Sequence, residues 1–172
     1  MKKIGNMAQG DMRRLARIRA LTLFYILALA ASGITAFPLL WETRLLCRWF
    51  GVGTPVGMRI PELACWLDYV HEGVAYNAAH YPFCAYGTDW LAFGHIVIAI
   101  FFIGVLIDPV RNIWIVRAGL IACALVPALA FACGSARGIP LFWRMVDTRF
   151  GAFGCIPLLI LQRWIGKEAT AS

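Results

Sequence analysis

Long apolar runs alternate with short polar segments along this chain. A helix rises about 1.5 Å per residue and the hydrocarbon core of a bilayer is about 30 Å thick, so about twenty apolar residues suffice to cross it. Runs of this kind occupy residues 18–40, 90–107, 109–133 and 140–165. They predict an all-α fold, an integral membrane four-helix bundle that forms a single membrane domain over residues 1–172.

Signals for helix ends flank the third and fourth runs. Asp108 can cap the third helix and Pro109 suits its first position, while Gly134 can end it. Pro140 suits the start of the fourth helix in the same way. Two further prolines, Pro127 and Pro157, lie inside these runs and predict kinks.

The segment between the first and second spans, residues 41–89, is too long for a simple connection. Within it, helical spacing gathers apolar side chains on one face and leaves the acidic residues and His71 mostly on others; the apolar face holds Leu63, Trp66, Leu67, Val70 and Val74. This pattern predicts an amphipathic helix on the membrane boundary or on the bundle. The preceding segment TRLLCRWFG predicts a shorter helix of the same kind.

The composition agrees with a membrane protein. Hydrophobic residues make up 61% of the chain and charged residues 15%, whereas soluble domains have about 45–50% and about 25%. The net charge of +7 raises the alternative of a nucleic-acid-binding protein, but six of the sixteen lysines and arginines lie in the first nineteen residues, before an apolar run. That placement predicts a lipid bilayer as the partner and no nucleic acid.

Positive charge also predicts the orientation. If the N-terminus is cytoplasmic, inner segments hold ten lysines and arginines and outer segments hold six. The positive-inside rule then places both termini in the cytoplasm of a multi-pass protein of the bacterial inner membrane, with residues 41–89 in the periplasm. A basic start followed by an apolar run is also typical of a signal peptide, so a cleaved first span is the alternative.

Small residues recur at four-residue spacing in two spans: Ala28, Ser32 and Ala36, then Ala124, Ala128 and Ala132. Such stripes let helices approach closely in lipid, either within the bundle or in a homo-oligomer or larger membrane complex.

His95 is an ionisable ring inside the second span, on the helical face of Ala92, Ala99 and Phe102. An ionisable residue within a span is a functional candidate, and the structural alternative is a ring that hydrogen-bonds across helices. A haem held by two histidines is disfavoured because His71 and His80 lie in the outer loop.

A second polar group lies near the outer end of the fourth span. Arg144 and Asp147 are three residues apart and can pair on one helical face. Their predicted depth matches that of His95 and Asp89, which suggests one shared polar cluster. Aromatic residues are expected around its mouth: Tyr81, Tyr86 and Trp143. The alternative is a purely structural ion pair.

The histidines and cysteines give little support for a metal site or a redox-active thiol pair. His71 and His80 are nine residues apart, on opposite faces of a continuous helix, so no metal site is predicted. The six cysteines form no C-x-x-C motif; Cys47, Cys65 and Cys84 lie in the predicted periplasmic loop, where two of them can form a disulfide.

Three segments, YPFCAYGTDWLAFGHIVIA, DPVRNIWIV and GIPLFWRMVDTRFGAFGCIPL, resemble a family of small bacterial four-span inner-membrane proteins with no known activity. The likeness covers residues 69–164 and implies a bacterial inner membrane. The four-helix layout is also similar to DoxX-like quinone-linked redox proteins, although none of their residues carries over.

These observations favour a structural or accessory membrane protein. The alternative is a small membrane redox or quinone-binding enzyme with a periplasm-side polar site at His95, Arg144 and Asp147. Neither an enzymatic activity nor a cofactor is predicted from the sequence. A transporter ranks third, because four spans would need to oligomerise to form a path.

Overall fold

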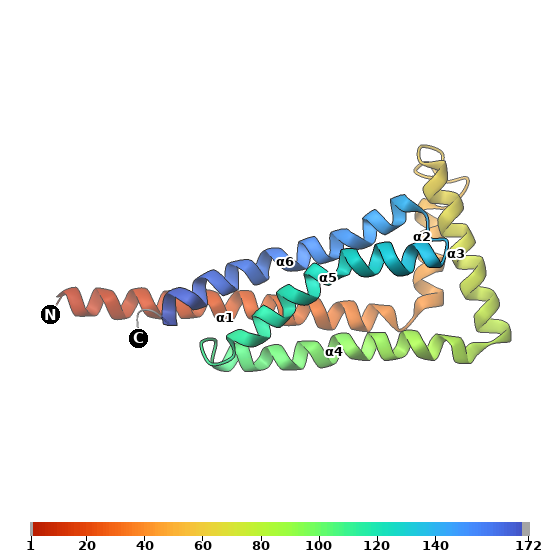
Figure 1. Ribbon diagram of the computed structural model, residues 1–172. Helices are drawn as coiled ribbons and strands as arrows, with labels where there is room; N and C mark the ends of the chain where they lie inside the picture. Colours follow the sequence, from red (N-terminus) through yellow and green to blue (C-terminus); the bar gives the residue numbers. More distant parts are fainter. Residues whose placement is uncertain (1, 170–172) are drawn as a thin grey trace. The chain divides into compact units, whose positions relative to one another are not determined.

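The computed structural model describes residues 2–169, and it describes side chains for residues 12–167. The elements follow one another as α1 (Lys2–Ala36), α2 (Leu39–Phe50), α3 (Pro61–His80), the short 3-10 helix η1 (Pro82–Ala85), α4 (Tyr86–Ile107), α5 (Ile113–Ala136) and α6 (Leu141–Ala169) (Figure 1). No strand occurs within residues 2–169. The predicted all-α fold is therefore confirmed.

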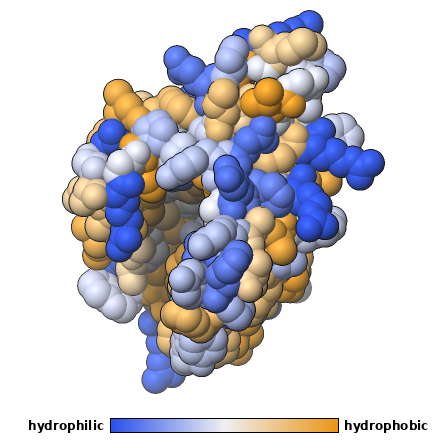
Figure 2. All heavy atoms as spheres, turned by 90° about the vertical axis from the view of Figure 1, so that its right-hand side faces the viewer, coloured by the Kyte–Doolittle hydropathy of each residue, from blue (hydrophilic) through white to orange (hydrophobic). Residues whose placement is uncertain are grey.

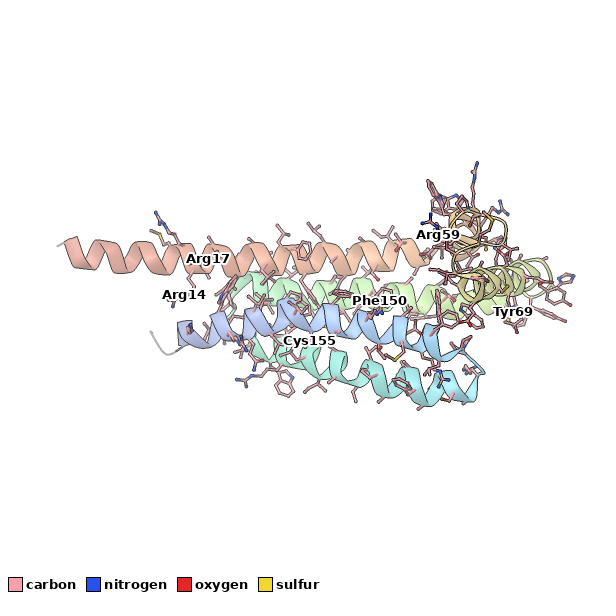
Figure 3. The ribbon with its side chains drawn as sticks, turned by 90° about the horizontal axis from the view of Figure 1, so that it is seen from above. Arg14, Arg17, Arg59, Tyr69, Phe150 and Cys155 are labelled. Atoms are coloured by element: carbon pink, nitrogen blue, oxygen red, sulfur yellow. The ribbon has the colours of Figure 1, made fainter. Side chains whose placement is uncertain are left out.

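Among the described residues, four segments are long and apolar enough to cross a membrane: Met12–Ala36, Pro82–Ile107, Ile113–Ala136 and Leu141–Lys167. Many of their large apolar side chains point outward. Phe150 on α6, labelled in Figure 3, is 72% exposed and Leu129 on α5 is 64% exposed. Such a surface is unfavourable in water and matches a hydrocarbon solvent.

Residues 2–169 form two compact units, residues 28–98 and residues 2–27 together with 99–169. We call the first the α2–α3 unit and the second the α5–α6 unit. Helices α1 and α4 each contribute to both.

The core of the α5–α6 unit is built from side chains of four helices. Phe102 of α4 is 2% exposed, and its ring centroid lies 4.8 Å from that of Tyr25 of α1. Further buried residues are Ile18, Val105, Val116, Leu158, Leu161 and Ile165. Thr22 is also buried, and its hydroxyl donates to the Ile18 carbonyl at 2.8 Å, which satisfies its only donor within α1.

Arg19 closes the C-terminal end of α4. Its guanidinium donates from Nε to the Leu106 carbonyl at 3.2 Å and from a terminal nitrogen to the Ile107 carbonyl at 3.3 Å. The last carbonyls of a helix lack intrahelical partners, and a cation there also opposes the negative end of the helix dipole.

The turn between α5 and α6 differs from the predicted one. Helix α5 passes Gly134 and ends at Ala136, so the assignment of Gly134 as the helix end is wrong. Gly138 provides the left-handed turn residue, with φ of +68°. Gly134 instead makes room for a side chain: a Cβ there would lie 2.7 Å from Cδ of Arg144.

The start of α5 also differs. The helix begins at Ile113, because Asp108 caps a separate turn in which its carboxylate accepts the Arg111 amide at 3.0 Å. Asn112 donates to the Gly104 carbonyl at 2.9 Å and ties this turn to α4. Both α5 and α6 continue through their internal prolines, Pro127 and Pro157, and the α5 ribbon bends near its middle (Figure 1).

In the α2–α3 unit the first span stops earlier than predicted. Helix α1 ends at Ala36 and α2 starts at Leu39, with Pro38 at the cap position between them. Proline has no amide hydrogen and disfavours helical conformation in the residue before it, here Phe37, so the continuous apolar run is divided. The predicted short helix within residues 43–51 is the C-terminal part of α2.

Glycines make the closest helix contacts. A Cβ on Gly33 would lie 2.7 Å from the Ala92 carbonyl oxygen, and one on Gly151 would lie 2.8 Å from the Cys123 carbonyl oxygen. The alanine stripe expected to pack the bundle is exposed in α5, at Ala124, Ala128 and Ala132, and so are Ala28 and Ser32 in α1. Packing within each unit therefore depends on other small residues than predicted, and association of copies through the stripes stays a prediction.

Candidate functional site

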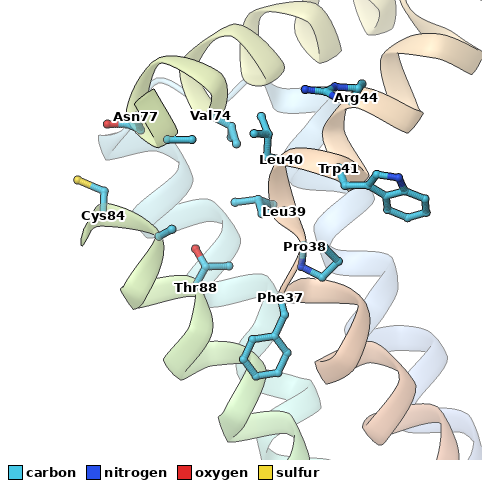
Figure 4. A pocket seen from close by; sticks show the side chains of 12 residues that line it. Phe37, Pro38, Leu39, Leu40, Trp41, Arg44, Val74, Asn77, Cys84 and Thr88 are labelled. Atoms are coloured by element: carbon cyan, nitrogen blue, oxygen red, sulfur yellow. The ribbon is translucent and has the colours of Figure 1, made fainter. Parts of the chain in front are cut away.

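The break at Pro38 opens a cavity in the α2–α3 unit. The residues after the break lead into α2, while the end of α3, η1 and the start of α4 form the other wall (Figure 4). The cavity has a volume of about 510 Å³ and is lined by Phe37, Pro38, Leu39, Leu40, Trp41, Arg44, Val74, Asn77, Ala78, Cys84, Ala85 and Thr88. We call it the Arg44 cavity.

The two ends of the Arg44 cavity differ in chemistry. Figure 4 shows Arg44 at one end and Phe37 at the other, with Leu39 and Leu40 between them. The Thr88 hydroxyl points into the cavity, whereas the Asn77 amide points away and donates to the Gly73 carbonyl of its own helix at 3.0 Å. A mostly apolar lining with one cation at the end is the pattern of a site for an amphiphile.

Within the described residues, the Arg44 guanidinium has no hydrogen bond or ion pair. It is also the one fully charged side chain among the residues that line the cavity. An incoming anionic group therefore has no internal carboxylate to displace.

A smaller cavity of about 310 Å³ lies in the same unit and shares Phe37. Its other lining residues are Tyr86, Asp89, Trp90 and Phe93. The rings of Tyr86 and Trp90 meet edge to face at 5.9 Å, as do those of Trp90 and Phe93. We call this the Asp89 cavity; it brings together Asp89 and Tyr86, two of the residues that the sequence singled out.

A polar interface joins α2 to α3. Thr43 shares a 3.0 Å hydrogen bond with Nδ1 of His71, and Asp68 accepts the Val52 amide at 3.0 Å. The Cys47 thiol donates to the Leu67 carbonyl at 3.3 Å. Burial, together with a hydrogen bond to Asp68 and the negative charge of Asp68, raises the pKa of Cys47 to about 11. The interface fixes the two helices together through side chains on both.

The apolar face predicted for α3 is mostly correct. Leu67 is buried, and Leu63, Trp66, Val70 and Val74 are partly buried. Asp68 and His71, however, are partly buried and bond to the segment after α2 and to α2, respectively. Arg48, Arg59, Glu62 and Glu72 of this unit are exposed. Hydrophilic and hydrophobic side chains both reach the face of the molecule seen in Figure 2.

His95 lies beside Gly33 of α1: a Cβ on Gly33 would be 3.1 Å from the His95 Cβ. Its predicted face is buried, since Ala92 is 0% and Ala99 4% exposed. Nδ1 of His95 is 2.9 Å from the Leu91 carbonyl, which can only accept, so Nδ1 carries the proton of this bond. The ring thus bonds to its own helix.

Arg144 and Asp147 belong to the α5–α6 unit. Arg144 donates to the Ser135 hydroxyl at 2.5 Å, and its guanidinium carbon lies 6.0 Å from the Phe131 ring centroid. Within the described residues no hydrogen bond or ion pair joins it to Asp147. Trp143, predicted at the mouth of the site, precedes Arg144 on the first turn of α6. The approach of this pair to His95 and Asp89 stays a prediction.

Tyr81 lies apart from both cavities. Its ring is 6.3 Å from those of Tyr76 and Phe83, and its side chain is 48% exposed. His80 stacks on Tyr76 at 4.2 Å. These aromatic rings around the end of α3 suit a membrane–water interface. Tyr69, farther back on α3, is 68% exposed and also projects outward (Figure 3).

The six cysteines are free thiols, with Cys65 and Cys84 exposed. No group of three or more histidine, cysteine, aspartate or glutamate side chains suited to a metal occurs among the described residues.

Four apolar helices of spanning length define the protein as a multi-pass integral membrane protein. No protein-family model, curated protein or solved structure matches the chain. Its function must therefore be inferred from its own residues.

Proposed function

We propose that the protein is an accessory protein of the bacterial inner membrane that holds an amphiphilic molecule in the Arg44 cavity. The observation that supports this proposal is the cavity itself, which has a volume of about 510 Å³, is apolar along its length and has a cation at one end. A site with this polarity suits a molecule with a polar head and an apolar chain. The role is binding and not catalysis.

The orientation belongs to the same proposal. The ten-to-six distribution of lysine and arginine favours cytoplasmic termini, which puts the α2–α3 unit on the periplasmic side. Phe37 directly follows the first spanning segment, which ends at Ala36. The apolar end of the cavity would then lie near the hydrocarbon boundary, and Arg44 at headgroup level.

The experiment uses a thiol inside the cavity and a control thiol outside it. Thr88→Cys places a thiol where the Thr88 side chain points inward, whereas Sγ of Cys84 points away in Figure 4. Delipidated protein in a neutral detergent is treated with a maleimide, with and without bacterial lipid extract. We expect the lipid to slow modification of the cysteine at position 88 but not of Cys84. Equal rates at position 88 with and without lipid would refute the proposal.

A membrane redox or quinone-binding enzyme is the second candidate. The Asp89 cavity favours it, because four aromatic side chains and a carboxylate line a space suited to a ring with polar substituents. Solvent extraction of the purified protein, followed by absorbance spectroscopy, tests this candidate. A stoichiometric quinone in the extract would support it, and an extract that contains only phospholipid would count against it.

A further inference from the structure

We infer that the ligand of the Arg44 cavity is a lipid with a net negative headgroup, whose anionic group binds the Arg44 guanidinium. This inference rests on the proposed function and adds the class of ligand. An exposed guanidinium presents planar, paired donors that match the oxygens of a phosphate.

The distribution of charge selects the headgroup. Among the described residues that line the cavity, only Arg44 carries a full charge, so a zwitterionic headgroup would leave its ammonium group without a carboxylate. Glu42 lies on the same helix but does not line the cavity. A headgroup with one net negative charge matches this lining, because that charge is balanced by the positive charge of Arg44.

The neighbouring carboxylate fixes the direction of binding. Asp89 lines the smaller cavity, which meets the Arg44 cavity at Phe37, the end opposite Arg44. An anionic headgroup would be repelled there and attracted at Arg44. The acyl chain therefore runs along Leu39 toward Phe37, in the direction of the spanning segments.

The size of the cavity limits what it holds. A volume of about 510 Å³ lies within the range of about 300–1,000 Å³ found for small-molecule sites. It accommodates the headgroup region and part of a chain, and its open side leaves the rest of the lipid in the bilayer. The site would thus recognise a headgroup without extracting the lipid.

The test compares lipids that differ only in their headgroups. The full-length Thr88→Cys protein, in neutral detergent, is titrated with phosphatidylglycerol, with phosphatidylcholine of the same chains, or with a ubiquinone, and maleimide modification at position 88 is followed. We expect phosphatidylglycerol to protect at a concentration about five- to tenfold lower than phosphatidylcholine, the preference expected for one arginine at a lipid headgroup.

Arg48 provides the matched control. It is exposed on the same helix, four residues after Arg44, and does not line the cavity. In the Thr88→Cys background, Arg44→Gln should abolish the preference for phosphatidylglycerol, and Arg48→Gln, with the same loss of charge, should retain it. Arg44→Lys keeps the cation and should retain most of the preference.

The outcomes separate the inference from the proposed function. Equal protection by phosphatidylglycerol and phosphatidylcholine, or equal effects of Arg44→Gln and Arg48→Gln, would overturn the anionic-lipid inference and leave amphiphile binding intact. Protection by the ubiquinone alone would overturn the inference in favour of a quinone ligand. Absence of protection by any of the three compounds would overturn the proposed function itself.

Discussion

At the scale of single residues, backbone proximity at Gly33 sets the packing around His95. The Ala92 carbonyl lies where a side chain on residue 33 would begin, and the His95 Cβ is also in contact range. A backbone carbonyl in a helix cannot move aside as a flexible side chain can. Glycine is required here for space and not for an unusual backbone conformation.

Gly33→Ala should therefore destabilise the protein by about 1–3 kcal/mol, the usual cost of an overpacked interior. Thermal unfolding in detergent measures the effect. Gly94→Ala is the control, because a Cβ at Gly94 meets nothing within 4 Å, and it should be neutral or slightly stabilising. Equal stability of Gly33→Ala and the unmodified protein would contradict the close approach of α1 and α4.

Cys47 differs chemically from the exposed cysteines. Its pKa of about 11 leaves about a hundredfold less thiolate at about pH 8 than the ordinary value of 9.0 would. The thiolate is the reactive species, so a maleimide should modify exposed Cys65 well before Cys47. The Cys47 rate should still increase as the pH rises toward 11, and peptide mass spectrometry resolves the two sites. Equal rates at about pH 8 would contradict a raised pKa.

At the scale of the elements, much of the structure was predictable from periodicity. The apolar face of α3 contained the correct residues because its period matches a helix. The same periodicity does not predict which residues bond to Asp68 and His71. The partner of His71 is Thr43 in α2, and the partner of Asp68 is Val52 in the segment after α2. The residue pattern of one helix does not reveal which residues of another segment contact it. Pro38 is a local signal for the break between α1 and α2, but the hydropathy is continuous across it and predicts a longer first span.

Asp68 connects α3 to the segment after α2. Asp68→Ala removes the acceptor of the Val52 amide, which should cost about 1–3 kcal/mol in local stability. Asp68→Asn retains a carbonyl oxygen and should preserve part of the bond. Hydrogen–deuterium exchange at Val52 measures the change, with faster exchange expected in the order native, Asp68→Asn, Asp68→Ala. Identical protection in all three proteins would show that the bond does not hold this segment.

At the scale of the whole molecule, the four spans followed from hydropathy and length, with helix ends that differ by several residues at Tyr86, Ile113 and Ala136. The Arg44 cavity did not follow from the sequence. Its walls come from three segments, residues 37–44, 74–78 and 84–88, that become neighbours only through the α2–α3 fold. A single arginine in a polar loop, such as Arg44, has no sequence pattern that marks it as a binding residue, whereas Asp89 and Tyr86 stand out because they border a span.

The central claim is an integral membrane protein whose α2–α3 unit faces the periplasm. The most direct measurement is modification by a membrane-impermeant maleimide in intact bacterial cells after mild reduction. Exposed Cys65 and Cys84 should react in intact cells, whereas a cysteine introduced by Lys167→Cys should react only after permeabilisation. Modification at position 167 in intact cells, with Cys65 and Cys84 unmodified, would contradict this orientation and the proposed role of the Arg44 cavity at the outer surface.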